Sequence, residues 1–542
     1  MSGQFLLSFV GSMAICLALI PALVASAGRL HILDLPADRK IHAIPIARVG
    51  GVGFGVGVFG ALLLWGPRNN LVTAYLLGGL LILLFGVWDD RSNLNYKVKF
   101  VGQFLAAGCA MWVGDIRLTS LPFFQDIALP YWISMSLTMV FLLGVTNAIN
   151  FSDGLDGLAG GLAFLSFGGM AFLAYDLGEP TLTIILVSVL GGLIGFMRFN
   201  TFPAKIFMGD GGSQFLGLYL GMTALVLMRS SHETISLPIM MLLLGLPILD
   251  SIGVITQRLG KGLSPFTADK NHIHHKLLSH GFHHYETVIL IYMVQAGMVF
   301  LAYALRWKDT QVSLALYLLI AGTALSLFFL ADHYKGTGAS ALRSRLGLNP
   351  PRQIAFPNLS KISLQVISVM VPGFLLFNIF LPFGIPKDLA FLALGCFILL
   401  LIAHVAFPHD SPFTTRVGLY IGTTFMVYLA ERVTDSTAWV LSIGLILFYI
   451  VLAALVLVTI RFQPENRFHV TPLDYLMVFF ALVIPNLPEL GLTQLHLGFF
   501  STKIIVLFFA FEILLMLHPQ SLSRLRLASL GLFLGLGIKS FL

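Results

Sequence analysis

The chain has 542 residues, of which 57% are hydrophobic and only 11% are charged, whereas a soluble globular domain carries about 25% charged residues. Together with a mean hydropathy of +0.90, this composition excludes a water-soluble fold, and three scattered cysteines exclude a disulfide scaffold. The formal net charge of +7 could suggest nucleic acid, but in a membrane protein basic residues report orientation first.

Apolar runs long enough to cross a bilayer predict an all-α fold, a polytopic transmembrane helical bundle. A span needs about 20 mainly apolar residues, and the chain offers about eighteen such segments, about 11 in a core and about 7 C-terminal to it. They are predicted near 4–26, 49–65, 70–88, 99–114, 131–149, 158–175, 180–197, 214–229, 237–256, 287–305, 311–331, 362–381, 388–407, 415–431, 437–460, 472–486, 500–517 and 526–541.

Basic residues predict the orientation of these spans. If the N-terminus lies outside, most of the 32 Lys and Arg residues fall in inside loops or at inner helix ends, as the positive-inside rule requires. Inside loops as far as residue 286 are dense in Asp, Asn, His and Lys, and such clusters stop after residue 332. We therefore expect a core at 1–331, a cytoplasmic basic linker with Gly and paired Pro at 332–361, and an additional transmembrane domain of unknown role at 362–542.

The first polar cluster is Asp89-Asp90 at the inner end of the third predicted span, followed by Lys97 and Lys99. A carboxylate pair is costly to bury at a membrane boundary, so it should be solvated, paired with cations or bound to a metal. A solvated helix end with flanking salt bridges explains the pair equally well.

The second cluster is NAINFSDGLDGL at 147–158. Asn147 and Asn150 share one helix face, and Asp153 and Asp156 each precede a glycine that permits close approach of a ligand. Amides and carboxylates together suit a metal or a nucleoside. An Asx- and Gly-rich turn is the structural alternative, but it accounts less well for four regularly spaced polar groups.

The third cluster is KIFMGDGGS at 205–213. Glycine-rich backbone at a helix start can present N–H groups to phosphate, Asp210 can hold a hard cation, and Lys205 can neutralise phosphate charge. A plain loop in which Asp210 or Ser213 caps the helix is the alternative.

The fourth cluster holds six of the fifteen histidines, between residues 272 and 284. The zincin pattern is absent, because Lys276 follows His272 by four residues and Gly281 stands where a zincin would carry Glu. Histidines and lysines beside a carboxylate favour pyrophosphate binding over zinc, although a basic interfacial helix on anionic lipid stays open. A fifth stretch, 34–51, adds cations on the same side.

In this order the clusters resemble the polyprenyl-phosphate N-acetylhexosamine-1-phosphate transferase family, and most closely its bacterial undecaprenyl-phosphate GlcNAc-1-phosphate transferases. The resemblance covers residues 1–331 and is specific because several motifs coincide. They are DRKIHAIPIARVGG (38–51), DDRSNLNYKVK (89–99), NAINFSDGLDGL (147–158), KIFMGDGGS (205–213), PILD (247–250) and SPFTADKNHIHH (264–275).

The resemblance implies a role for each polar residue. Asp210 and Asn150 would ligate Mg²⁺, or Mn²⁺ in its place, and Asp89 would deprotonate or position the lipid phosphate, with Asp90 beside it and Lys99 on phosphate. The implied substrate-binding residues are Lys40, Asn147, Asn150, Asp153, Asp156, Phe207 as a stacking surface for uracil, and His272, His274 and His275 at pyrophosphate or sugar.

The implied reaction transfers N-acetylhexosamine 1-phosphate, with GlcNAc 1-phosphate expected, from a UDP-sugar to undecaprenyl phosphate and releases UMP. It would start a lipid-linked cell-surface glycan, such as lipopolysaccharide, at a bacterial inner membrane, with the active site facing the cytoplasm. Partners are then the UDP-sugar donor, the lipid acceptor and membrane lipid, not nucleic acid; a homodimer is left open.

Two alternatives to this reaction stay open. UDP-FucNAc, UDP-QuiNAc, UDP-GalNAc or UDP-MurNAc-pentapeptide would keep the chemistry and change the donor. An ion-coupled transporter would place acids near mid-span, whereas the core carboxylates lie at predicted inner helix ends.

Overall fold

The computed structural model describes nearly all of the predicted spans. The described residues are helical apart from connecting turns and one pair of two-residue strands, β1 (Leu33–Asp34) and β2 (Ile46–Ala47). The predicted all-α, polytopic fold class is confirmed. The description covers residues 2–34, 45–120, 129–231, 235–264, 271–333, 357–380, 385, 387–406, 411–431, 439–462 and 497–540.

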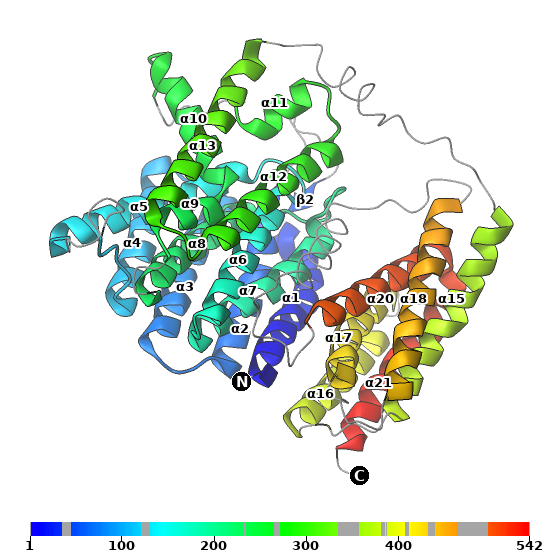
Figure 1. Ribbon diagram of the computed structural model, residues 1–542. Helices are drawn as coiled ribbons and strands as arrows, with labels where there is room; N and C mark the ends of the chain where they lie inside the picture. Colours follow the sequence, from blue (N-terminus) through cyan, green and yellow to red (C-terminus); the bar gives the residue numbers. More distant parts are fainter. Residues whose placement is uncertain are drawn as a thin grey trace. The chain divides into compact units, whose positions relative to one another are not determined.

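The chain divides into two compact units, the first made mainly of Met1–Asn349 and the second mainly of the residues that follow (Figure 1). The first contains α1 (Ser2–Leu30), α2 (Gly50–Trp65), α3 (Asn70–Ser92), α4 (Tyr96–Gly114), α5 (Tyr131–Ser152), α6 (Leu158–Asp176), α7 (Pro180–Asn200), α8 (Gly209–Ser230), α9 (Leu237–Leu244), α10 (Leu246–Gly260), α11 (Ile273–Ser279), α12 (His284–Leu305) and α13 (Thr310–His333). The second contains α15 (Pro357–Phe377), α16 (Lys387–Ala406), α17 (Ser411–Glu431), α18 (Trp439–Phe462), α20 (Leu497–Leu517) and α21 (Leu522–Lys539).

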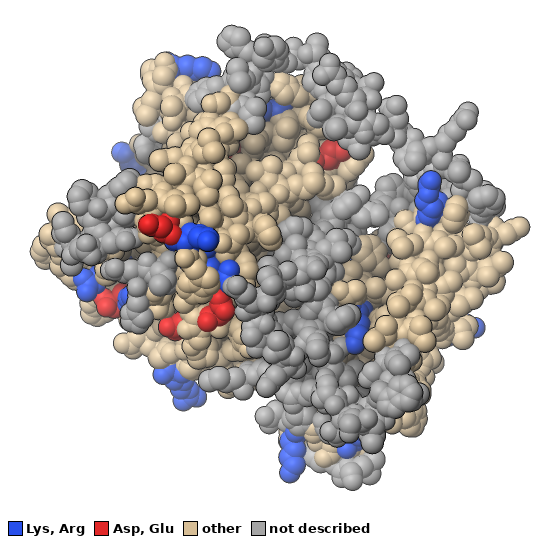
Figure 2. All heavy atoms as spheres, in the orientation of Figure 1, with Lys and Arg blue, Asp and Glu red and all other residues tan. Residues whose placement is uncertain are grey.

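Among the described residues, ten helices are long and apolar enough to cross a membrane, or eleven if one bent pair counts as a span. Large apolar side chains on the outer faces of the helices in the first unit are uncovered: Trp112 in α4 is 81% exposed, Leu63 in α2 69% and Val140 in α5 68%. Figure 2 shows charged groups as small, separate patches on the described part of the visible face. Such an apolar exterior belongs in lipid.

Helix α8 is the centre of the first unit. Most of its residues are buried, and it packs against α2, α3 and α5. Glycines on both sides of each contact permit this: a methyl group on Gly86 of α3 would lie 2.1 Å from the Cα atom of Gly211, and one on Gly51 of α2 would lie 2.4 Å from that of Gly212. These facing glycines therefore let the backbones of α2 and α3 touch that of α8.

The predicted single span at 237–256 is wrong in its shape. It is broken at Gly245 into α9 and α10, which meet at 88°. Gly245 has φ +61°, and Gln295 supports the break by accepting a hydrogen bond from the Leu246 N–H at 2.9 Å and donating one to the Leu243 carbonyl at 3.1 Å. Hydropathy predicts the length of an apolar segment, but it does not indicate whether that segment is bent.

Three predictions lie wholly or mostly outside the described residues. They are the predicted span at 472–486, the predicted substrate-binding residue Lys40 and most of the predicted linker, at 334–356.

We expect Gly245→Ala to destabilise the first unit. A non-glycine residue held in a sparsely populated backbone conformation such as this one costs about 1–3 kcal/mol, and the new methyl group would lie 2.1 Å from Gln295 Oε1, so that side chain must leave its hydrogen bonds. Thermal unfolding of the purified protein in detergent measures the effect. The control is Gly260→Ala in α10, where a methyl group would have no neighbour within 4 Å; equal melting temperatures for the two variants would contradict this account of the break.

Candidate active site

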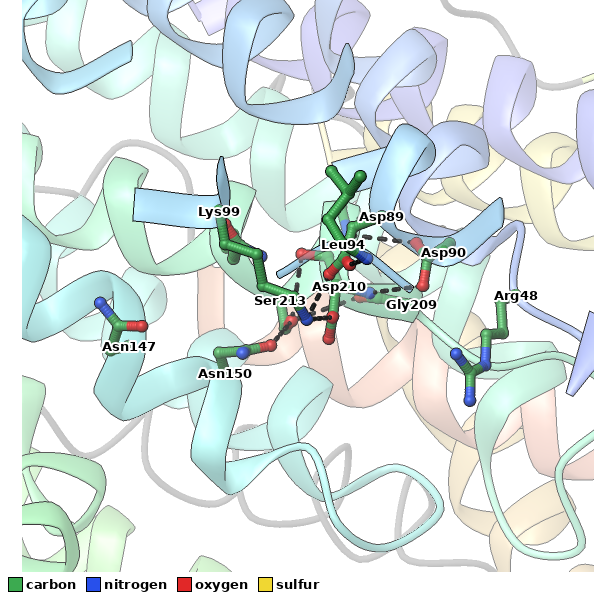
Figure 3. A network of polar contacts seen from close by, with 12 residues as sticks. Arg48, Asp89, Asp90, Leu94, Lys99, Asn147, Asn150, Gly209, Asp210 and Ser213 are labelled. Carbon is green, nitrogen blue, oxygen red and sulfur yellow. Dashed lines mark hydrogen bonds and ion pairs between the residues drawn. The ribbon is translucent and has the colours of Figure 1, made fainter. Parts of the chain in front are cut away.

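Two carboxylates and one ammonium group form the centre of the site (Figure 3). Lys99 Nζ lies 2.5 Å from Asp89 Oδ2 and 2.8 Å from Asp210 Oδ2. Asp89 comes from the end of α3, Lys99 from the start of α4 and Asp210 from the start of α8. Because chain direction alternates between spans, these helix ends meet at one end of the bundle. Asp89 is buried, its Oδ1 atom accepts from the Leu94 N–H at 2.7 Å, and the Asp210 side chain is 33% exposed.

Asp90 has a different environment from its neighbour. Its two carboxylate oxygens accept hydrogen bonds from the N–H groups of Asp210 at 3.0 Å and Gly211 at 3.3 Å. A carboxylate at a helix N-terminus satisfies unpaired donors and complements the helix dipole. Asp90 thus fixes the start of α8 to the end of α3, and these two amides point at Asp90, not toward a phosphate as the glycine-rich sequence had suggested.

The structure brings Asn150 to the carboxylates and leaves Asn147 apart from them (Figure 3). Asn150 Oδ1 accepts a hydrogen bond from the Ser213 hydroxyl at 2.6 Å, which links α5 to the first turn of α8. The Asn147 side chain instead bonds to Gln103 and to the Leu143 carbonyl.

The two aspartates of the α5–α6 turn also differ. Burial, together with the negative charges of Asp210 and Asp156, raises the pKa of Asp153 to about 7, against a lowering by the charge of Arg48. Asp153 therefore lies within electrostatic reach of the centre. Asp156 Oδ2 accepts from the Ala204 N–H at 2.9 Å and its own N–H donates to His284 Nε2 at 3.2 Å, so Asp156 supports the turn before α8.

The histidine-rich loop packs on this same turn. A methyl group on Gly154 would lie 2.2 Å from His274 Nε2, the His272 ring lies 5.6 Å from the Phe151 ring, and the His275 ring lies 4.3 Å from that of His274. The second and fourth sequence clusters, more than a hundred residues apart, thus adjoin in space.

Two contributors had been given no role by the sequence. Asp250 in α10 holds the histidine loop: its Oδ2 atom lies 2.8 Å from His272 Nδ1, and its Oδ1 atom accepts from the Ile273 N–H at 2.9 Å. Arg48, which is paired with Asp34, lies near the carboxylates (Figure 3). Asp250 lies in the motif PILD and Arg48 in the motif DRKIHAIPIARVGG. Membership of these motifs was the only sequence feature that could have indicated a role for either residue.

Phe207 lies in the segment that leads into α8. Its N–H donates to the Ala47 carbonyl at 2.8 Å and its carbonyl accepts from the Gly50 N–H at 3.0 Å, while its side chain is half-buried. These backbone hydrogen bonds therefore join the start of α2 to the start of α8 and fix the position of the Phe207 backbone, from which the ring extends.

Oxygen atoms of Asp89, Asp210 and Asn150 are the groups that a hard cation would meet. Asp89 Oδ2 is buried and receives no hydrogen bond although it contacts the Lys99 ammonium. Within the described residues there is no group of three or more His, Cys, Asp or Glu that could hold a metal. Two carboxylates and an amide suit Mg²⁺, which takes few protein ligands and keeps waters and substrate oxygens, and do not suit a structural zinc.

Comparison with known proteins places this bundle in a class. Residues 72–228, which run from α3 into α8, match the family model described as glycosyl transferase family 4. The chain is 32% identical over 318 residues to a probable undecaprenyl-phosphate N-acetylglucosaminyl 1-phosphate transferase of Bacillus subtilis (strain 168), which spans 58% of this chain and 88% of the relative.

Two further relatives agree. Decaprenyl-phosphate N-acetylglucosaminephosphotransferase of Mycobacterium leprae (strain TN) is 32% identical, over 49% of this chain and 75% of its own length. Undecaprenyl-phosphate alpha-N-acetylglucosaminyl 1-phosphate transferase of Escherichia coli (strain K12) is 29% identical, over 50% of this chain and 75% of its own length. The chain belongs to the polyprenyl-phosphate N-acetylhexosamine-1-phosphate transferase family, as its motifs had indicated, and is a transferase.

We expect the His274 ring to stay neutral from pH 5 to pH 8. Burial, and then the charges of His275, His272 and His284, lower its pKa to about 3. The unfolded chain takes up this proton near pH 6.5, so His274 lowers the free energy of unfolding as the pH falls below that value. Ring carbon shifts of ¹³C-histidine-labelled protein, assigned with His274→Gln, measure this; a midpoint above pH 5 would contradict it.

Proposed function

We propose that the protein transfers N-acetylhexosamine 1-phosphate, with GlcNAc 1-phosphate as the expected group, from a UDP-sugar to undecaprenyl phosphate, and that UMP is released. The observation that carries the proposal is the Asp89–Lys99–Asp210 group at one end of the first unit. The relatives' names support the transferred sugar and the type of lipid acceptor.

The reaction needs alignment and charge neutralisation more than covalent machinery. An oxygen of the lipid phosphate forms a bond to the phosphorus atom that carries the sugar. The bond from that phosphorus to the bridging oxygen breaks, and UMP leaves with that oxygen. Lys99 supplies positive charge beside both carboxylates, and a charge that is already held in place is effective because it needs little reorganisation during the reaction.

The donor atoms of the site fit a divalent cation. Asp210, Asp89 and Asn150 would hold Mg²⁺, which would neutralise the pyrophosphate; Mn²⁺ could replace it. Two carboxylates beside one ammonium leave an excess negative charge, which favours a further cation at this point. Asp90 acts through the backbone of α8, because both of its oxygens are bonded there.

The neighbouring loops offer a surface for the rest of the donor. Asp153, Phe207 and the histidine loop lie around the turn between α5 and α6 and the start of α8. A neutral His274 can donate or accept a hydrogen bond. We infer that these groups meet the nucleoside and sugar.

The basic residues of the loops favour a cytoplasmic site. Most Lys and Arg residues fall on the side of the Asp89 and Asp210 helix ends, where soluble nucleotide sugars are available. A bacterial inner membrane is the location that we propose, with the product as the first lipid-linked intermediate of a surface glycan such as lipopolysaccharide.

Transfer of radiolabelled sugar phosphate from UDP-GlcNAc to undecaprenyl phosphate tests the proposal. We expect purified protein with Mg²⁺ to form both lipid-linked product and UMP, and to stop when EDTA removes the metal. Product with UDP-FucNAc, UDP-QuiNAc, UDP-GalNAc or UDP-MurNAc-pentapeptide alone would keep the chemistry and change the donor. Failure with every donor would refute the proposal and favour an ion-coupled transporter.

Asp210→Asn should abolish transfer and leave the protein folded, because the substitution keeps the shape of the side chain and removes a charge at a partly exposed position. We expect at least a hundredfold loss of rate in the radiolabel assay. The matched control is Asp115→Asn, an exposed carboxylate paired with Arg117 and Arg229 at the other end of α4 and α8. Equal rates in the two variants would remove Asp210 from the reaction.

The first unit should carry the transferase activity by itself. The site residues described here all belong to it, and the family model matches within it. We expect a fragment ending near residue 335 to retain part of the activity. Complete loss in a fragment that stays monodisperse on size-exclusion chromatography would show that the later spans belong to the catalytic unit.

A further inference from the structure

Three amide side chains, two of them buried and the third half-buried, lie one helical turn behind the candidate site. Gln103 Nε2 donates to Gln214 Oε1 at 3.1 Å and to Asn147 Oδ1 at 3.3 Å, and Gln103 Oε1 accepts from Asn147 Nδ2 at 2.9 Å. Gln103 and Gln214 are each 3% exposed. We name Gln103, Asn147 and Gln214 the amide network.

Each member of the amide network lies one helical turn from a residue of the site, on the same helix face. Gln103 follows Lys99 in α4, and Gln214 follows Asp210 in α8. Asn147 precedes Asn150 in α5, which runs in the opposite sense toward the site. The three helices that supply Lys99, Asp210 and Asn150 are therefore joined to one another one turn deeper in the bundle.

We propose that the amide network is a positioning element for the transferase reaction, which sets the axial register of α4, α5 and α8 and thereby the spacing of Lys99, Asn150 and Asp210. The inference rests on the proposed function. Hydrogen bonds between amides are directional, whereas the hydrophobic effect at an apolar contact of equal volume has no preferred direction. A displacement of about 1 Å in a reacting group can cost about a hundredfold in rate.

The contacts of Asn147 support a positioning role in place of substrate binding. Its Nδ2 atom donates to Gln103 and also to the Leu143 carbonyl at 2.8 Å, and its Oδ1 atom accepts from Gln103. Both ends of the amide are thus engaged inside the bundle. Asn150, one turn nearer the site, bonds instead to Ser213 of α8.

The test is Gln103→Met, which keeps an unbranched side chain of similar length and removes every hydrogen bond of the central member. Initial rates with UDP-GlcNAc and undecaprenyl phosphate give kcat and both KM values per folded molecule, as measured by size-exclusion chromatography. We expect kcat to fall about 10- to 100-fold while both KM values stay within about twofold, because only alignment in the transition state is lost.

The control is Tyr75→Phe. Tyr75 in α3 bonds to Thr223 Oγ1 in α8 at 2.9 Å, in the interior of the bundle, and it lies about 20 Å along α3 from Asp89. This variant loses a buried interhelical hydrogen bond of α8 far from the site. We expect it to lower the melting temperature without changing kcat.

A double variant, Gln103→Met with Gln214→Met, separates a network from independent contacts. When residues act as one unit, removing one member already removes the function of the whole unit, and removing a second causes little further loss of rate. We therefore expect the kcat of the double variant to be about as low as that of Gln103→Met alone. The inference is overturned if Gln103→Met keeps the kcat of the unchanged protein, or if Tyr75→Phe reduces kcat equally. A wild-type protein that is inactive with every donor would overturn the proposed function and this inference with it.

Discussion

The site depends on one electrostatic constraint: two carboxylates from distant parts of the chain converge at the membrane boundary and need a cation between them. Lys99 supplies that cation, in contact with both Asp89 and Asp210. The arrangement is tolerable because the group lies at helix ends, where Asp210 is still partly exposed, and not at mid-bilayer, where a charge would cost several kcal/mol. The same constraint leaves an excess negative charge, which gives the site its affinity for a divalent cation in our proposal.

The constraint extends into the backbone. Asp90 holds the start of α8 through two amides, and glycines at positions 86 and 211 let α3 and α8 approach closely enough for this to happen. The neighbouring loops add a second layer, in which Asp250 orients His272 and Asp156 supports the turn before α8. Polar residues that share a motif therefore divide into those that face the site and those that hold it.

Sequence periodicity and hydropathy were sufficient for the fold class and for the end of the bundle at which the site lies, since alternating span direction brings the ends of α3 and α5 to the starts of α4 and α8. Periodicity and hydropathy could not predict that Asp89 and Asp90 have different contacts, or that Asn150 and Asn147 do. Adjacent residues, and residues on one helix face, differ only in which neighbouring helix they contact. The break at Gly245 was also missed, since it depends on Gln295, fifty residues later, and hydropathy has no signal for such a partner.

The second unit contains a charged pair of its own, and its geometry favours a role in packing. Arg416 Nε in α17 lies 2.8 Å from Glu512 Oε1 in α20, and the Tyr420 hydroxyl donates to the same carboxylate. Ionisable residues inside membrane helices are costly and often mark transport pathways. Here the carboxylate has an opposite charge and a hydroxyl group within the unit, so both charges are compensated where they lie. An ion pathway requires a group that can exchange partners, whereas this pair joins α17 to α20, which is the simpler physical account of its presence.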